Sequence, residues 1–308
     1  MQAADFTVSA PDGAVLFVHR WRPDGPAKAV VQIAHGLSEH GGRYARLAAA
    51  LADAGYASYA GDHRGHGRSA ETADDLGFFA ERDGWRLCAD DLWRLNRRIA
   101  ADHPGLPIIL LGHSMGSFMA QDFIARHGEA LAGVVLSGSD GKPPPLAALG
   151  RLVARLERLR LGRRGRSGLL QAFSFDAFNK PFAPARTPCD WLSRDPVEVD
   201  TYIADPLCGV PATVQVWVDL LDALGGIASP ARQARIPKRL PILVIAGDRD
   251  PVSRNTKGLE QLLAAYRTAG LERVSHRFYA GARHELFNET NRDEVTRDVI
   301  AWMDEVLR

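Results

Sequence analysis

The stretch Gly112-His113-Ser114-Met115-Gly116 constrains the fold of this chain more than any other feature. A short apolar run at 107–111 precedes it, and apolar side chains recur after it at three- and four-residue steps. This pattern predicts a buried strand that turns sharply through Ser114 into a helix, whereas a glycine-rich loop would need neither element. The serine backbone is strained in such a turn, so side chains two positions to either side would collide. We therefore expect Ser114 at the C-terminal edge of a sheet, beside a helix N-terminus.

Strands and helices are predicted to alternate along most of the chain, which is typical of a mostly parallel sheet covered on both faces. The expected strands are 5–10, 14–21, 29–34, 56–60, 107–111, 132–137, 240–246 and 273–280, and the expected helices include 43–54, 85–101 and 255–269. The alternation stops at Asp140 and resumes near Leu240, with proline- and arginine-rich sequence between them. We therefore predict an α/β core of residues 1–140 and 237–308, with residues 141–236 inserted as a cap.

A serine hydroxyl becomes a good nucleophile only when a base takes its proton and an acid orients the base. In a sheet of this kind the acid and the base follow later strands, in the order serine, acid, histidine. Asp250 is the preferred acid, because it lies deep in the loop after the 240–246 strand and Pro251 holds it extended. Asp248 would instead stabilise the turn, and Asp140, after the preceding strand, is a third candidate.

His284 is the expected base, because it lies between the last strand and the last helix. A loop histidine there can reach the sharp turn at Ser114, which we call the elbow. His276 is the competitor, but it lies inside the last strand pattern and is expected to pack there. Two backbone N–H groups should point at the negative charge that develops on the substrate. We expect this oxyanion hole from Met115, directly after the serine, and from Leu37. Gly36 permits the backbone turn that aims the N–H of Leu37. The alternative is that His35 and Gly36 form only a tight strand-to-helix turn.

These residues belong to longer motifs, and the motifs together carry a family resemblance. They are His35-Gly36-x-x-Glu39-His40-x-x-Arg43-Tyr44, Asp62-x-Arg64-Gly65-x-Gly67-x-Ser69, Gly112-His113-Ser114-Met115-Gly116, Gly247-x-x-Asp250 and His284-Glu285. The combination resembles the α/β-hydrolase superfamily and, within it, the monoacylglycerol lipase and lysophospholipase branch. The resemblance covers the core at both ends of the chain and is weaker across the cap. It implies an α/β-hydrolase fold, with a mostly parallel central sheet flanked by helices and a mainly helical cap.

The same resemblance implies roles for particular residues. It implies a triad of Ser114, Asp250 and His284, and a site floor shaped by Glu39, Arg43 and Tyr44. Glu39 and Arg43, one helical turn apart, would otherwise form a simple ion pair. The 62–69 loop is expected to be structural, with Asp62 and Arg64 bracing its turn, and its histidines are not expected to bind a metal.

The first part of the cap is basic and regularly spaced. From Lys142 to Arg166 the chain has eight basic residues and one acid, Glu157. Leucines recur at helical spacing at Leu149, Leu152, Leu156 and Leu159. One interpretation is a solvated helix whose leucines face the core, and the other is a helix that docks on an anionic lipid surface. Later aromatic residues offer apolar surface for an acyl chain: Phe173, Phe175, Phe178, Phe182, Trp191 and Trp217.

Composition argues against several other classes of protein. A formal net charge of +1 gives no reason to expect a nucleic-acid partner. Three well-separated cysteines form neither a disulfide framework nor a metal-binding spacing, which favours a reducing compartment such as the cytoplasm. The N-terminus lacks a signal-peptide pattern, and no apolar run has membrane-spanning length. The sequence leaves the oligomeric state open.

We therefore expect a serine hydrolase that cleaves carboxylic esters through an acyl-enzyme, with no metal or organic cofactor. Monoacylglycerols or lysophospholipids are the expected substrates. General esterase, thioesterase or amidase activity with the same triad is the enzymatic alternative. A binding protein that keeps the fold without catalysis is the alternative from another class, and the complete set of triad residues argues against it.

Overall fold

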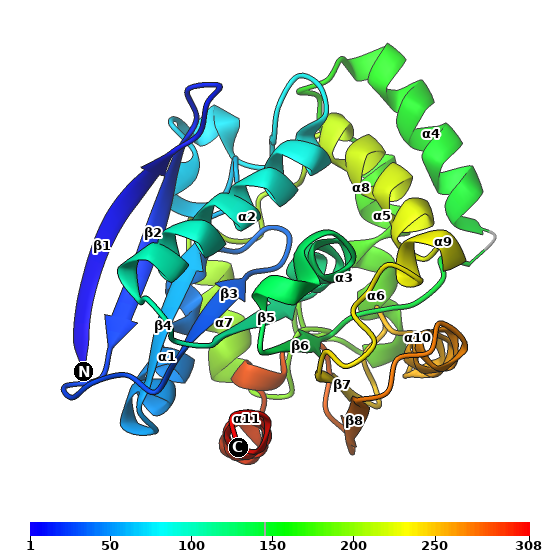
Figure 1. Cartoon of the computed structure of the whole chain (residues 1–308). Helices are drawn as coiled ribbons and strands as arrows, with labels where there is room; N and C mark the ends of the chain where they lie inside the picture. The colour runs from blue at the N-terminus through cyan, green and yellow to red at the C-terminus, as the bar shows by residue number, and fades with distance from the viewer. Residues whose placement is uncertain (145) are drawn as a thin grey trace.

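The computed structural model describes residues 1–144 and 146–308, and a single sheet runs through its centre (Figure 1). Within these residues eight strands lie in the order β1-β2-β4-β3-β5-β6-β7-β8. They are β1 (Gln2–Ser9), β2 (Val15–Arg22), β3 (Ala29–Ala34), β4 (Tyr56–Gly61), β5 (Ile108–His113), β6 (Gly133–Ser137), β7 (Ile242–Gly247) and β8 (Val274–Tyr279). β2 pairs antiparallel with β1 and with β4, and every other neighbouring pair is parallel. The prediction of a mostly parallel sheet is confirmed.

Helices cover both faces of the sheet, and the strands supply a core to each face. One face carries α1 (Ala45–Asp53) and α11 (Arg292–Val306), and the other carries α2 (Gly84–Asp102), α3 (Met115–His127) and α10 (Lys257–Thr268) (Figure 1). Successive strand residues point to opposite faces. In β5, Leu110 joins the core beneath α2 and α3, whereas Leu111 joins the core beneath α1 and α11. Both residues are fully buried, as expected for a strand in a sheet that helices cover on both faces.

The expected elements agree with the structure to within a few residues. β1 begins at Gln2 and not at residue 5, because its pairing with β2 continues to Gln2 opposite Arg22. The helix expected from residue 43 begins at Ala45, because the preceding turn is a short 3₁₀ helix. The 3₁₀ helices of the core are η1 (Gly41–Tyr44), η2 (Gly67–Ser69), η3 (Ala73–Asp75), η4 (Gly128–Ala130) and η6 (Leu286–Asn288).

Every regular element described between β6 and β7 is a helix. It contains α4 (Leu146–Leu161), α5 (Gly168–Phe173), α6 (Phe175–Asn179), η5 (Lys180–Phe182), α7 (Pro196–Ala204), α8 (Val214–Ile227) and α9 (Pro230–Gln233). α4 lies beside α8 at the outside of the molecule (Figure 1), and Arg155 of α4 donates to Asp222 of α8 at 2.9 Å.

Four regularly spaced leucines of α4 are exposed. α4 buries Ala154 and Glu157, so it packs through a small side chain and a hydrogen-bonded carboxylate. The exposed fractions of Leu149, Leu152, Leu156 and Leu159 are 53, 54, 55 and 83%. The interpretation that these leucines face the core is therefore wrong, and the helix presents an exposed apolar stripe.

Candidate active site

Ser114 forms the tight turn between β5 and α3. Its backbone has φ 51° and ψ −121°, a conformation that residues with a side chain rarely adopt. A Cβ on Gly116 would lie 2.0 Å from the carbonyl oxygen of Ala34, and a Cβ on Gly112 would lie 2.4 Å from that of Gly116. Both positions therefore require glycine. The half-buried Ser114 side chain lines a cavity at the C-terminal edge of the sheet.

His284 lines the same cavity, and Asp250 forms a buried pair with it. Nδ1 of His284 lies 3.0 Å from Oδ1 of Asp250, and 2% and 0% of the two residues' surfaces are exposed. The same Oδ1 accepts the N–H of Val252 at 2.9 Å, which fixes the carboxylate. Within the described chain no hydrogen bond joins the Ser114 hydroxyl to His284, although both line the cavity. Such a bond often tightens only when substrate is present.

The surroundings of His284 determine its charge. Burial by itself lowers the pKa of His284, but the charge of Asp250 and its hydrogen bond raise the pKa above the usual 6.5. His113 lies alongside, with its ring centroid 4.7 Å from that of His284. Burial and then the charge of His284 lower the pKa of His113 to about 4. Near neutral pH His113 is therefore uncharged, and His284 is the ring that can exchange a proton.

The competing candidates have other partners. Asp248 is exposed, and its Oδ1 accepts the N–H of Gly281 at 2.8 Å, so it stabilises the turn. Asp140 accepts a hydrogen bond from Arg254 at 3.1 Å. His276 is exposed on the edge strand β8. In the part of the chain that the structure describes, none of the three is hydrogen-bonded to the serine or to the buried pair.

The expected oxyanion hole lies where two backbone segments meet. A Cβ on Gly36 would lie 3.1 Å from the Cβ of Ser114, so this loop passes against the serine. The N–H of Gly36 donates to Oε1 of Glu39 at 2.5 Å, which fixes the loop. Leu37 and Met115, the first residue of α3, both line the cavity. Their role as oxyanion donors stays a prediction.

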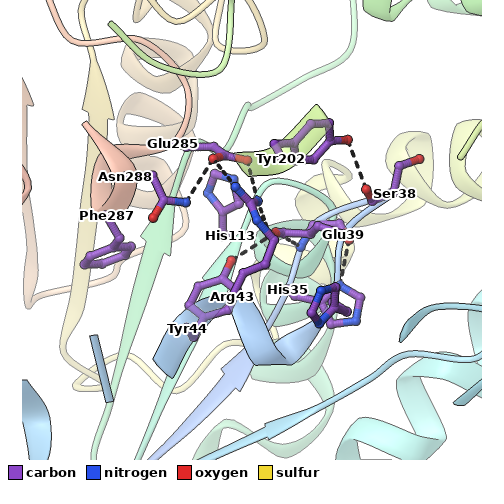
Figure 2. A network of polar contacts seen from close by, with 12 residues as sticks. His35, Ser38, Glu39, Arg43, Tyr44, His113, Tyr202, Glu285, Phe287 and Asn288 are labelled. Carbon is purple, nitrogen blue, oxygen red and sulfur yellow. Dashed lines mark hydrogen bonds and ion pairs between the residues drawn. The ribbon is translucent and has the colours of Figure 1, made fainter. Parts of the chain in front are cut away.

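Ser38 joins this loop to the inserted segment. Its backbone has a φ of 61°, and its carbonyl oxygen accepts the hydroxyl of Tyr202 at 3.0 Å and the N–H of Gly209 at 2.9 Å. The Ser38 hydroxyl in turn donates to the carbonyl oxygen of Val210 at 2.8 Å. Figure 2 shows Tyr202 reaching Ser38 from the α7 side. The inserted segment therefore holds the loop at the residue directly after Leu37, the expected oxyanion donor.

A buried network lies behind the cavity (Figure 2). Arg43 donates to Oε2 of Glu39 at 2.7 Å, and its two terminal nitrogens donate to the two carboxylate oxygens of Glu285, each at 2.7 Å. Tyr44 donates to Oε1 of Glu39 at 3.0 Å. Burial disfavours the charge of Arg43, but Glu285 outweighs it and raises the pKa of Arg43 well above its usual value. Of Glu39, Arg43 and Tyr44, the described lining of the cavity includes Glu39 alone.

Sequence reasoning assigned no role to Glu285, although its position beside His284 was part of the motif. Its partner Arg43 lies 242 residues earlier, so no local pattern could have revealed the contact.

The cavity has a volume of about 460 Å³ and mostly apolar walls. Five of the six aromatic residues expected to contact an acyl chain line it: Phe173, Phe175, Phe178, Trp191 and Trp217. Phe182 lies instead beneath the guanidinium of Arg283, 4.3 Å from the ring centroid. Leu146 and Leu149 of α4 line the cavity and are also exposed, so the cavity opens beside the leucine stripe.

The 62–69 loop has the structural contacts expected of it. Asp62 accepts the N–H groups of Gly41 and Arg68, each at 2.7 Å, and Arg64 binds Asp91. In the described residues, two groups have ligand atoms close enough together for a metal ion: His19, His40 and Asp62, and His40, Asp205 and Cys208. They share His40, whose Nε2 lies 2.9 Å from Oδ2 of Asp205.

The fold and the site define an α/β-hydrolase. Residues 25–291 match the family model Hydrolase_4, described as serine aminopeptidase, S33, and the chain belongs to this family of serine hydrolases. The monoacylglycerol lipase of Mycolicibacterium smegmatis is 32% identical over 304 residues, which cover 94% of each chain. The monoglyceride lipase of Homo sapiens is 30% identical, over 94% of this chain and 85% of that protein.

A solved structure gives the same fold. The highly thermostable carboxyl esterase of Bacillus coagulans, in complex with glycerol, superposes with a TM-score of 0.91 at 26% identity, over 100% of both chains. Among the described residues, no helix combines the length and the apolar character needed to cross a bilayer.

Proposed function

We propose that the protein hydrolyses carboxylic esters that carry one acyl chain on a small polar head, such as monoacylglycerols or lysophospholipids. One observation carries this proposal: Ser114 and His284 line one apolar cavity of about 460 Å³, and Asp250 lies behind the ring of His284 at hydrogen-bond distance. That volume lies within the range of roughly 300 to 1,000 Å³ that is common for small-molecule sites. The names of the relatives, monoacylglycerol lipase and monoglyceride lipase, point to the first of these substrates.

In the proposed reaction, Oγ of Ser114 attacks the ester carbonyl carbon while His284 takes the hydroxyl proton. The N–H groups of Leu37 and Met115 donate to the oxyanion of the tetrahedral intermediate. His284 then gives its proton to the leaving alcohol, and Asp250 stabilises the imidazolium while it exists. Water, deprotonated by His284, attacks the acyl-enzyme and releases the acid. These steps use no metal and no organic cofactor.

We further propose that residues 141–236 act as a cap that selects the substrate. Its aromatic side chains supply much of the cavity wall, where each buried methylene of an acyl chain contributes roughly 0.8 kcal/mol at most. A wall of this kind favours one extended chain, and the enclosing helices disfavour a bulky triacylglycerol.

The exposed stripe of α4 supports peripheral contact with an anionic membrane surface. Its leucines lie on the same helix as four arginines, Arg151, Arg155, Arg158 and Arg160, and Arg163 follows just beyond the helix end. Apolar insertion and attraction to anionic lipid act together in interfacial helices. Because the cavity opens beside Leu146 and Leu149, a chain leaving the bilayer there would enter it directly.

The cysteines support a reducing compartment, and we propose the cytoplasm. Cys88, Cys189 and Cys208 are all free thiols in the fold. Secreted proteins of this size more often use disulfides.

The test of the function is hydrolysis of a graded panel of p-nitrophenyl esters and monoacylglycerols by wild-type protein and by Ser114→Ala. We expect activity to rise from acetyl to medium-chain esters. Ser114→Ala should lose several orders of magnitude of kcat and all labelling by a fluorophosphonate probe, with an unchanged melting temperature. Ser139→Ala, which removes a buried serine bonded to Gln121 at 2.9 Å, is the matched control. More than a few percent of wild-type activity in Ser114→Ala would identify a different nucleophile, and a profile that peaks at acetyl would contradict the lipid substrate.

A further inference from the structure

The proposed reaction requires that two loops, distant in the sequence, stay at a fixed position relative to each other. The oxyanion loop, residues 35–39, must aim the N–H of Leu37, and the histidine loop, residues 281–285, must aim the ring of His284. Arg43 is bonded to both loops. It binds Glu39 in the first loop at 2.7 Å and binds Glu285 in the second through two parallel bonds, both at 2.7 Å.

The surroundings of Arg43 indicate a bridge and not a substrate-binding cation. Only 9% of its side chain is exposed. Glutamates contact it on two sides, and the ring of Tyr202 from the inserted segment covers it with its centroid 4.9 Å from the guanidinium carbon. Figure 2 shows the guanidinium enclosed between Glu39 and Glu285.

We propose that Arg43 is a positioning residue that fixes the oxyanion loop and the histidine loop relative to each other, a role that rests on the proposed ester hydrolysis. In one direction Arg43 holds the Glu39 carboxylate, whose other oxygen accepts the N–H of Gly36 at 2.5 Å. In the other direction it holds Glu285, the residue next to His284. Asn288 supports the second contact by donating to Glu285 at 2.9 Å.

The chemistry of the bridge requires a guanidinium. A planar fork with several N–H donors can bind one carboxylate bidentately and still donate to another. An ammonium group has the charge but not this geometry, so lysine is not an equivalent residue here.

Arg43 also balances the charge near His284. The titratable groups that face His284 from the surrounding elements are Asp250, Glu285, Glu39 and His113. Without Arg43, two buried glutamates would have no cation between them, and both favour a protonated imidazole. The acid limb of kcat/KM should then move to higher pH, which a loss of fold stability alone would not cause.

The experiment measures kcat, KM and the pH profile on a p-nitrophenyl ester and on a monoacylglycerol, per site titrated with a fluorophosphonate probe. For Arg43→Met we expect kcat to fall about tenfold to a hundredfold, KM to change little on either substrate, and the acid limb to move to higher pH. Arg43→Lys should lose kcat to a smaller degree and keep the wild-type acid limb. Adding Glu285→Gln to Arg43→Met should move the limb part of the way back.

The matched control is Arg126→Met. Arg126 binds the buried Asp122 at 2.9 Å on α3, away from both loops, and its loss should change neither kcat nor the acid limb.

Two results overturn the proposal. One is a folded Arg43→Met, judged by melting temperature and titrated sites, with wild-type kcat and acid limb. The other is a higher KM for the monoacylglycerol alone at unchanged kcat, which would make Arg43 a substrate-binding residue. If Arg43→Met does not fold, Arg43→Lys and Glu285→Gln are judged by the same kcat and pH criteria. Wild-type protein that neither cleaves the esters nor reacts with the probe refutes the proposed function itself, before any variant is compared.

Discussion

Membrane contact through α4 can be tested by replacing its exposed leucines. Leu149 also lines the cavity, so the test uses Leu152→Ser, Leu156→Ser and Leu159→Ser in one variant. Their exposed fractions are 54, 55 and 83%. A fully buried leucine side chain gains about 1.5 to 3 kcal/mol, so the three together offer about 3 to 6 kcal/mol to a lipid phase. If half of that surface enters the bilayer, the gain is about 1.5 to 3 kcal/mol, or about tenfold to 150-fold in partitioning.

The assay is co-sedimentation with phosphatidylserine-containing vesicles and with phosphatidylcholine vesicles, together with turnover of a water-soluble short ester. The triple variant should bind anionic vesicles about tenfold to 150-fold more weakly and keep wild-type kcat on the short ester. Val197→Ser is the matched control, because Val197 is a 67% exposed apolar residue on α7, outside the stripe. The control should bind as wild type does.

Salt separates the two contributions to binding. The electrostatic part should weaken as ionic strength rises, while the leucine part should persist. Equal vesicle binding by the wild type and the triple variant at both low and high salt would refute the reasoning. So would a large fall in kcat on the short ester, because it would show that the leucines support the site and not the membrane contact.

Three further outcomes are expected. Asp250→Asn should lower kcat by about 10⁴-fold, because an amide favours the wrong imidazole tautomer, while Asp248→Asn should leave kcat close to wild type; the reverse order in steady-state kinetics would exchange their roles. Gly116→Ala should lower the melting temperature sharply or prevent folding, because its Cβ would lie 2.0 Å from a backbone carbonyl oxygen, and a stable, active variant in calorimetry would contradict the elbow geometry. Acid should destabilise the fold, because burial is the largest cause that lowers the pKa of His63 to about 3 and that of His113 to about 4, against 6.5 for an ordinary histidine. The two histidines contribute fully to the free energy of unfolding above pH 6.5, and this contribution is lost as the pH falls towards their folded-state pKa values. The loss is about 1.4 kcal/mol per pH unit for each histidine. A free energy of unfolding from urea titrations that stays constant below pH 6.5 would contradict this expectation.

The elements of the fold could be predicted because their causes are local. Apolar runs mark the buried strands, and the glycines on either side of Ser114 leave few other conformations for that turn. The strand order is not local. β4 lies between β2 and β3, antiparallel to the first and parallel to the second. No periodicity along the chain contains that information.

In the candidate site, too, some features follow from local sequence and others only from the folded chain. Ser114, Asp250 and His284 could be named from their positions after strands and from their order along the chain. The direction of the α4 leucines could not, because helical spacing shows that an apolar stripe exists but not which way it faces. In α4 the small Ala154 packs inward, and Leu152, Leu156 and Leu159 are left exposed. The contact of Arg43 with Glu285 depends on two loops meeting in space, which only the folded chain shows.

The two hydrogen bonds from Tyr202 and Gly209 to the carbonyl oxygen of Ser38 bear on how such enzymes diversify. A cap grafted from a relative would have to bring its own hydroxyl and N–H to that oxygen. Otherwise a recombinant enzyme would lose turnover in the same step in which it acquired a new specificity. Point changes on the inner walls of the existing helices avoid this coupling, so they are the more accessible route to new substrates, both in evolution and in the laboratory.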